Sequence, residues 1–272
     1  MTDKTELLTV KLINLKWQQL ILSLGCLLLM IACKNFYPTT NPNANLLKVA
    51  TDPTFIPFEI QRASGNLEGF DIDLMNAIAK VAGFAVQFES LPFDGMISTL
   101  QAKRVDAAIS GITITAERLK TIAFSRPYFK AGLAIAVRQD NQNIKDFNSL
   151  KGKKIAVQIG STGADFAKTI PNAKISTFSS GPEFFQDLLN GNVDAVISDA
   201  FATLYAIKNG NLQGIKVVTD LLTQEYYGIA TPKDSPHLDV INKGIATLLS
   251  NGTYNQIYQK WFNVDPPQLP DS

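Results

Sequence analysis

The chain has almost no cysteine or histidine. The two cysteines of the sequence, Cys26 and Cys33, both lie near its beginning, and the single histidine is His237. The rest of the chain therefore has no disulfide and no thiol chemistry, even if it works outside the cytoplasm. With so few soft ligands a transition-metal site is not expected, and no cofactor is indicated.

An excess of charge and a long apolar run are also missing. The sequence has 25 Lys and Arg against 24 Asp and Glu, a formal net charge of +1, which is no footprint for nucleic acid. No apolar run reaches the roughly 18 residues of a membrane-spanning helix. What remains is a globular composition, with 46% hydrophobic residues in a chain of 272. This length suits one large or two medium domains.

The first 32 residues are predicted to be an export signal. Lys4, Lys11 and Lys16 precede an apolar run over 20–32. A run of about 13 residues is short for a membrane span and typical of the apolar core of a signal peptide. A buried helix is the alternative, but it leaves the charged beginning without a purpose.

The apolar run ends in Ala32-Cys33, which resembles the lipobox of bacterial lipoproteins. This resemblance implies cleavage before Cys33 and attachment of lipid to it. The polar segment 33–45 then reads as a flexible tether. The protein is expected in the periplasm or on the outer face of the plasma membrane, anchored by lipid. An ordinary cleaved signal, with Cys33 incidental, is the alternative.

From Leu46 onward, strand and helix patterns alternate. Apolar runs predict strands at Leu46–Ala50, Ala85–Phe88, Val105–Ser110, Leu133–Val137, Lys154–Gln158, Lys174–Phe178 and Val193–Ser198. Helical spacing predicts helices after Asp71 up to Gly83 and at Gly95–Lys103, Ala164–Thr169, Glu183–Asn190, Phe201–Lys208, Val240–Ser250 and Tyr254–Trp261. Asp71 reads as an N-cap. The alternation indicates an α/β fold with largely parallel sheets.

One sequence pattern occurs twice. A helix followed by a strand ends in Val105–Ser110 and again in Val193–Ser198, with the same spacing from a leucine to the final serine. The repeat suggests two similarly built lobes. Ligands of open α/β sheets bind beyond the carboxyl ends of strands. A ligand held between two lobes is therefore expected.

A free amino acid needs a cation for its carboxylate, an anion for its ammonium and a pocket for its side chain. Arg118 offers a planar fork that suits a carboxylate, and backbone amides at Thr113 could add donors. Asp199 is a candidate partner for the ammonium, or else an N-cap for the helix that follows it. The loop 160–163 begins a helix whose amides favour anions, but it lacks the lysine of a nucleotide-binding loop.

Three further residues are candidates for the side-chain pocket. Phe55 and Phe93 each lie beside a turn at a short strand, where they could flank a ligand or simply pack in a core. Asp52 ends the first strand, where it either meets the ligand side chain or caps a turn.

Four segments, in order, resemble the signatures of family 3 of the bacterial solute-binding proteins, which serve ABC importers. They are ATDPTFIPFE at 50–59, GFDIDL at 69–74, SGITIT with Glu117-Arg118 at 110–118, and NGTYNQIYQKWF at 251–262. The likeness runs from about Leu46 to about Val264 and is nearest to glutamine- and arginine-binding proteins. It implies a protein that delivers a polar amino acid to a membrane permease and is not an enzyme.

The resemblance implies roles for individual residues. Arg118 would clamp the carboxylate of the ligand, and Asp199 would take its ammonium. Gln158 is typical of arginine-binding relatives, whereas Phe93 favours glutamine, so both ligand classes stay open. The implied ligand-binding residues are Asp52, Phe55, Phe93, Ser110, Gly111, Thr113, Arg118, Gln158, Ser161, Thr162, Ser198 and Asp199.

The implied fold has two α/β lobes joined by two hinge strands, of the type II periplasmic-binding-protein kind, with a discontinuous first lobe that closes on the ligand. After signal and tether, the expected boundaries are lobe one at 46–127, hinge at 128–132, lobe two at 133–223, hinge at 224–228, the rest of lobe one at 229–265 and a tail at 266–272.

Two other classes of function are compatible with parts of the sequence. The family resemblance extends to cyclohexadienyl-dehydratase-like enzymes, but a dehydratase needs a placed acid or base, and ligand charges already account for Asp52 and Asp199. An amino-acid sensor would need a separate partner protein.

Overall fold

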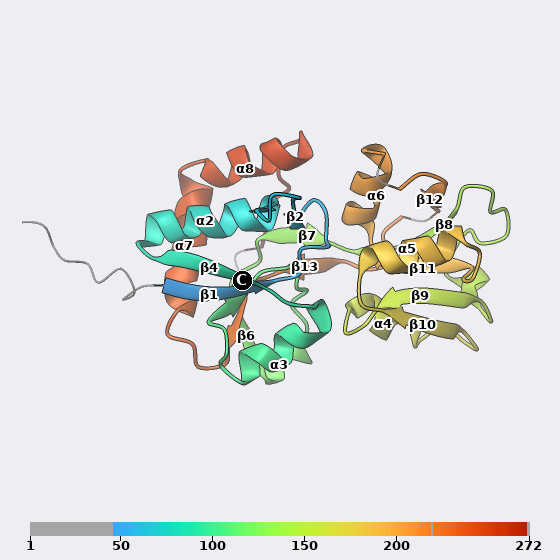
Figure 1. Ribbon diagram of the computed structural model, residues 1–272, viewed down its shortest axis with the longest axis horizontal. Coiled ribbons are helices and arrows are strands. Elements are labelled where there is room, and N and C mark those ends of the chain that lie inside the picture. Colours follow the sequence, from blue (N-terminus) through green and yellow to red (C-terminus); the bar gives the residue numbers. More distant parts are fainter. Residues whose placement is uncertain (1–45, 211, 219, 271–272) are drawn as a thin grey trace, which may run out of the picture. The chain divides into compact units, whose positions relative to one another are not determined.

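The computed structural model describes residues 46–210, 212–218 and 220–270 (Figure 1). The chain divides into residues 1–44 and residues 45–272, and the following account concerns the second unit by itself. The predicted signal peptide, Cys33 and the tether lie outside the described residues. Within the described ranges, no helix combines the length and the apolar character needed to cross a membrane.

The first lobe is built on a five-stranded sheet in the order β4-β1-β5-β14-β6. β1 runs parallel to β4 and β5, whereas β14 is antiparallel to both of its neighbours. The strands are β1 (Leu46–Thr51), β4 (Ala85–Ser90), β5 (Ala107–Ala108), β6 (Ile122–Phe124) and β14 (Ala230–Pro232). The other elements are β2 (Ile60–Gln61), β3 (Leu67–Glu68), α2 (Phe70–Ala82), η1 (Phe93–Gly95), α3 (Met96–Gln101), η2 (Arg118–Lys120), α7 (Leu238–Ser250) and α8 (Thr253–Phe262).

The second lobe has its own five-stranded sheet in the order β10-β9-β11-β8-β12. β9 pairs in parallel with β10 and β11, and β8 is antiparallel to β11 and β12. Its strands are β8 (Leu133–Arg138), β9 (Lys154–Gln158), β10 (Lys174–Phe178), β11 (Ala195–Asp199) and β12 (Ile215–Val217). Its helices are η3 (Asn148–Leu150), α4 (Thr162–Ala167), α5 (Gly181–Leu189) and α6 (Ala200–Lys208).

Two short strands lie where the chain crosses between the sheets. β7 (Phe129–Ala131) and β13 (Glu225–Tyr227) pair antiparallel, between the two lobes in Figure 1. Because β14, α7 and α8 follow β13 and return to the first sheet, the first lobe is discontinuous. The expected α/β class and two-lobed fold are confirmed, but the expectation of largely parallel sheets is wrong, because both sheets are mixed.

Each lobe has its own hydrophobic core. In the first lobe, aromatic rings from four separate segments interlock around Phe58, Phe70, Phe129 and Phe262, with ring centroids 4.9 to 6.1 Å apart. The second core is mainly aliphatic and lies on both faces of its sheet. The edge-to-face and tilted packing of the four rings holds together the loop before β2, α2, β7 and α8, which carry them.

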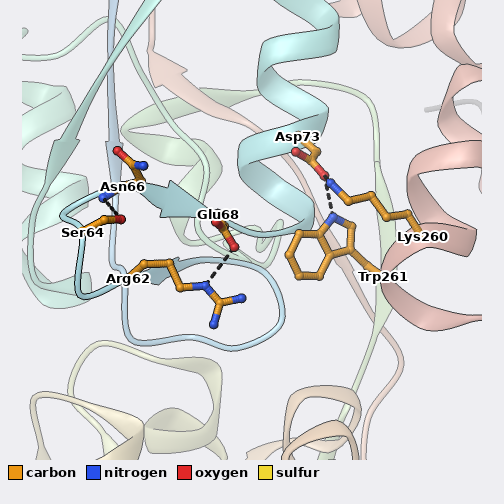
Figure 2. A network of polar contacts seen from close by, with 7 residues as sticks. All are labelled: Arg62, Ser64, Asn66, Glu68, Asp73, Lys260 and Trp261. Carbon is orange, nitrogen blue, oxygen red and sulfur yellow. Dashed lines mark hydrogen bonds and ion pairs between the residues drawn. The ribbon is translucent and has the colours of Figure 1, made fainter.

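The beginning of α2 differs from the prediction. Its N-cap is Gly69, with no side-chain cap, and Asp71 is buried inside the lobe, so the N-cap role expected of Asp71 is wrong. In the same first turn, Asp73 accepts hydrogen bonds from Lys260 and from the Trp261 indole at 2.7 Å (Figure 2). The two acidic residues of one turn thus have different partners, and Asp73 ties α2 to α8.

Candidate functional site

A cavity of about 50 Å³ lies between the lobes, where β1, β5, β9 and β11 present their carboxyl ends. All twelve residues expected at the ligand site line it. Strands of both sheets therefore direct their polar ends toward one place, as the repeated strand pattern predicted. Four further lining residues were not expected: Leu133, Ile197, Glu225 and Tyr227.

Arg118 spans the cavity from the first lobe. One guanidinium nitrogen donates to the carbonyl of Thr113 at 2.8 Å, and the other donates to the carbonyl of Gly160 at 2.9 Å. The guanidinium also lies 5.6 Å from the ring centroid of Phe93, within cation–π range. Burial lowers the pKa of Arg118, and the nearby carboxylate of Glu225 opposes this shift. Arg118 is the one cation among the described residues that line the cavity.

Asp52 is buried at the end of β1. Its carboxylate accepts hydrogen bonds from Thr54 at 2.8 Å, from the backbone amide of Phe93 at 3.2 Å and from the Gln158 amide at 3.3 Å. Burial raises the pKa of Asp52, while the hydrogen bonds from Thr54, Phe93 and Gln158 lower it. Asp52 thus caps a turn, which is one of the two alternatives from the sequence, and it also lines the cavity. Its bond to Gln158 joins the lobes.

Asp199 also serves two purposes. One carboxylate oxygen caps α6 by accepting from the Ala202 amide at 2.7 Å, and the other accepts from the Tyr227 hydroxyl at 2.6 Å. Burial is the main cause that raises the pKa of Asp199, to about 6. The N-cap alternative is therefore correct in geometry, and the same carboxylate remains part of the cavity lining.

Glu225 lies on the crossing strand β13 and contacts both lobes. One of its carboxylate oxygens accepts from the hydroxyl of Thr113 at 2.9 Å and from the hydroxyl of Thr162 at 2.9 Å. Its other oxygen accepts from Thr223 at 3.0 Å. Glu225 is thus a third carboxylate in the cavity, fixed at the point where the lobes meet.

The aromatic residues divide between the cavity and the core. Phe55 stacks on Phe58 at 5.0 Å and meets Tyr227 edge-on, so it lines the cavity from the margin of the core. Gly111 adopts a φ of +53°, and a Cβ there would lie 2.5 Å from the Phe55 ring. The absence of a side chain at Gly111 therefore lets the ring and the loop share one wall.

The loop of the second lobe is held locally. Ser161 caps α4 by accepting from the Ala164 amide at 3.1 Å, and it donates to the carbonyl of Gln158 at 2.8 Å. Ser198 and Thr162 complete this wall. The wall is neutral and hydrogen-bonding in character.

Glu225 and Tyr227 were missed because they come from the second crossing strand, about 26 residues after Asp199 and outside every matched signature. The signal was nevertheless present, since both residues fall inside the expected hinge at 224–228.

Comparisons with known proteins agree with this geometry. The family described as bacterial extracellular solute-binding proteins, family 3, matches residues 47–264. The "Probable histidine-binding protein" of Neisseria gonorrhoeae is 35% identical over 231 residues, covering 83% of this chain and 85% of that protein.

Solved structures are similar over most of their length. An ancestral arginine-binding protein bound to arginine is 44% identical with a TM-score of 0.77, covering 80% of this chain and 98% of that one. The arginine-, lysine-, histidine-binding protein ArtJ of Geobacillus stearothermophilus is 38% identical with a TM-score of 0.76, covering 81% of this chain and 96% of that one.

Proposed function

Because the chain belongs to family 3 of the bacterial extracellular solute-binding proteins, we propose that it captures a cationic amino acid, arginine above all, outside the cytoplasm and delivers it to an ABC importer. The relatives compared above are amino-acid-binding proteins, and two of them carry arginine in their names. The identity of the amino acid that this chain binds is therefore the open question.

The balance of charge in the cavity carries this proposal. Three carboxylates, those of Asp52, Asp199 and Glu225, face one guanidinium. A neutral amino acid such as glutamine brings one positive and one negative charge and leaves the excess of carboxylates unchanged. An arginine or lysine ligand adds a further cation, which compensates one of the buried carboxylates.

The proposed position of the ligand follows from the side chains and amides that line the cavity. Arg118 clamps the ligand carboxylate with help from the amides of Thr113 and Thr162. Asp199 takes the ammonium together with the carbonyl of Ser110 or Gly111. The remaining expected residues hold the side chain: Phe55 and Phe93 flank it, and Asp52, Gln158 and Ser198 surround its far end.

A competition experiment tests the choice of ligand. The purified protein is titrated by calorimetry with arginine, lysine, histidine, glutamine, leucine and glutamate. We expect arginine and lysine to bind best, glutamine more weakly, leucine weakly and glutamate least, because a second ligand carboxylate meets only like charge at Asp52. Glutamine binding more tightly than arginine would contradict the proposal.

The location of the protein, its membrane anchor and its permease partner belong to the same proposal. We infer a signal peptide over 1–32, a lipid anchor on Cys33, a tether over 33–45 and a permease partner that reads the closed lobes. The hinge positions 128–132 and 224–228 and the lobe boundaries given above belong to this proposal as well. The pairing of β7 with β13 supports them.

We further propose binding without turnover. Each oxygen of Asp52 and Asp199 already accepts a hydrogen bond, so these carboxylates act as fixed anchors. Mass spectrometry of arginine recovered after long incubation with the protein should show the unchanged amino acid. Any accumulating product would favour an enzyme instead.

A further inference from the structure

Behind the ligand cavity lie two carboxylic acids that none of the proposed ligand contacts uses. Glu59 is the last residue of the first signature segment, Asp71 lies in the first turn of α2, and both are fully buried. The carboxyl of each residue acts on the other electrostatically, so the two lie close together. One buried oxygen of each, Oε2 of Glu59 and Oδ1 of Asp71, has no hydrogen-bond partner among the described residues. A proton shared between these two oxygens would give both a partner, whereas two ionised carboxylates would repel each other.

The outer oxygens of the pair hold the loop that lines the cavity. Ser110 donates its hydroxyl proton to Oε1 of Glu59, and the amide of Gly111 donates to Oδ2 of Asp71 at 2.9 Å. Ser110 in turn accepts from the backbone amide of Asp52 at 3.0 Å. Glu59 and Asp71 therefore touch no ligand, but each is one hydrogen bond away from the wall assigned to the ligand ammonium.

We propose that Glu59 and Asp71 share one proton and act as a single monoanionic positioning pair, which fixes Ser110 and Gly111 and places one negative charge behind the ligand ammonium. The role assigned to the ammonium rests on the proposed function, whereas the shared proton does not. The class of ligand that such a wall favours is a primary ammonium, the group common to all free amino acids.

The electrostatic surroundings agree with a retained proton. Burial raises the pKa of Glu59 well above its ordinary value, and the charge of Asp71 raises it further. Burial also raises the pKa of Asp71, to about 7. The titratable groups that face the pair are Asp52, whose charge also acts on Glu59, and the phenols of Tyr128, Tyr227 and Tyr254. None of these four is a cation that could replace the proton.

Geometry explains why Asp71 is the member that keeps the charge. Its Oδ2 accepts from both Gly111 and the hydroxyl of Tyr128, the latter at 2.8 Å. Two donors on one oxygen favour the ionised form. Glu59 accepts only one hydrogen bond on its outer oxygen, from Ser110, so Glu59 is the member of the pair that carries the proton. The pair titrates as a unit, with pKa values that belong to both groups.

The first test needs no ligand. Either single amide substitution, Glu59→Gln or Asp71→Asn, makes the shared proton unnecessary. A carboxyl whose pKa is raised in the folded protein contributes stability at low pH and loses it as pH rises toward the folded pKa. The melting temperature of each variant relative to the native protein should therefore increase steadily from pH 5 to pH 8.

The surface variant Glu68→Gln is the control, because Glu68 is half exposed and paired only with Arg62. The melting temperature of Glu68→Gln relative to the native protein should not change with pH. Flat differences for Glu59→Gln and Asp71→Asn as well would show that no proton is shared, and the proposal would fall. This outcome does not depend on which ligand the protein binds.

The second test uses arginine titrated into the full purified chain. Each single amide variant keeps one carboxylate and its hydrogen bonds, so the affinity should stay within roughly threefold of the native value. The double variant Glu59→Gln with Asp71→Asn keeps the shape but has no charge, and it should lose roughly tenfold or more. A folded double variant of native affinity would refute the electrostatic role, and a double variant that fails to fold leaves the pH profiles of the single variants decisive. Absence of arginine binding by the native protein would instead refute the proposed function.

Discussion

At the scale of single residues, the ligand clamp proposed for Arg118 depends on the shape of a guanidinium. Arg118 donates to carbonyls of Thr113 in one lobe and Gly160 in the other, which requires two nitrogens held in one plane. Lysine has the charge but only one nitrogen on a flexible stem. The clamp is thus a matter of geometry as much as of charge.

We expect Arg118→Lys to weaken arginine binding by about 2–5 kcal/mol while the protein stays folded, because a buried charge-assisted pair is truncated. Calorimetry measures the affinity, and circular dichroism checks the fold. Arg62→Lys is the matched control, since Arg62 lies in an exposed pair with Glu68 and should change nothing. Native affinity in Arg118→Lys would remove Arg118 from the site.

The Asp199 carboxyl predicts how binding depends on pH. Its pKa is raised to about 6 without ligand. A bound ammonium favours the carboxylate and lowers this pKa, so binding below pH 6 must expel a proton. We expect arginine affinity to be constant above about pH 7 and to fall by up to about tenfold per pH unit below 6.

Calorimetry at pH 5.5 in buffers of different ionisation enthalpy measures the released proton directly. Asp199→Asn should bind more weakly and should lack the step near pH 6. A step that persists in this variant would mean that another group, such as the Glu59–Asp71 pair, carries the pH dependence.

We expect Asp52 to decide which class of ligand side chain is bound. Its carboxylate is buried and already accepts from two neutral amides, those of Phe93 and Gln158. A cationic side chain gains an ion pair there, whereas the glutamine amide gains only a hydrogen bond. Asp52→Asn should therefore reduce arginine affinity sharply and glutamine affinity only modestly in a competition assay. Equal losses for both ligands would show that Asp52 does not face the side chain.

At the scale of elements, one glycine sets how α2 begins. Gly69 has φ 148° and ψ 171°, a region that only glycine occupies readily, and a Cβ there would lie 1.9 Å from the carbonyl oxygen of Phe58. Gly83, at the other end of α2, also has a positive φ of 78°, but open space surrounds it. A comparison of substitutions at the two glycines therefore separates the cost of backbone strain from the cost of a steric clash.

We expect Gly83→Ala to cost about 1 kcal/mol, the strain of a left-handed residue, and Gly69→Ala at least about 3 kcal/mol, because strain and clash add. Urea denaturation of both variants measures the difference. Equal costs would mean that the segment around Phe58 moves away freely.

The elements that the sequence predicted are the long ones. β1, β8, β9 and β10 were expected nearly to the residue, because each has five or six residues in which apolar side chains recur. β5 and β11, the two strands of the repeated pattern, each lie third in a five-stranded sheet. Strands of two or three residues such as β6, β12 and β14 have no readable period. In the two five-stranded sheets they take part in three of the four antiparallel pairs, and the fourth pair joins the longer strands β8 and β11.

The sequence likewise predicted some residues of the candidate site and missed others. Asp52, Gln158 and Asp199, at the ends of strands of five or six residues, were predicted and line the cavity, and so does Ser110, which follows the two-residue strand β5. Glu225 was not, because nothing local marks a carboxylate on a three-residue strand. Glu59 was predicted only as part of a signature, and Asp71 only as part of a signature and as an N-cap, since an acidic residue in a sequence reads as exposed until its burial is known.

At the scale of the whole molecule, the two cysteines offer a matched pair for the anchor. Cys33 is the expected lipid acceptor, and Cys26 lies in the apolar run before it. Cells fed labelled palmitate should label the native protein and the Cys26→Ser variant, whereas Cys33→Ser should carry no label. Label retained in Cys33→Ser, or missing from the native protein, would contradict the anchor.

At this scale we also expect the two lobes to close when the ligand binds. Hydrogen bonds from Arg118 to Gly160, from Gln158 to Asp52 and from Thr162 to Glu225 bridge the lobes or tie the second lobe to the crossing strand. Without ligand, the excess of carboxylates in the cavity opposes this arrangement, and a bound cation removes much of the repulsion. Closure and binding should therefore be coupled.

Small-angle scattering with and without arginine measures this coupling. We expect the radius of gyration to decrease at saturation, because β7 and β13 are the two strands by which the chain passes from one lobe to the other and thin connections bend easily. Glutamate at the same concentration should leave the radius unchanged, and so should arginine added to Arg118→Lys below its weakened affinity. An unchanged radius for the native protein at confirmed saturation would mean that binding does not require the lobes to move, so the cross-lobe hydrogen bonds would already be present without ligand.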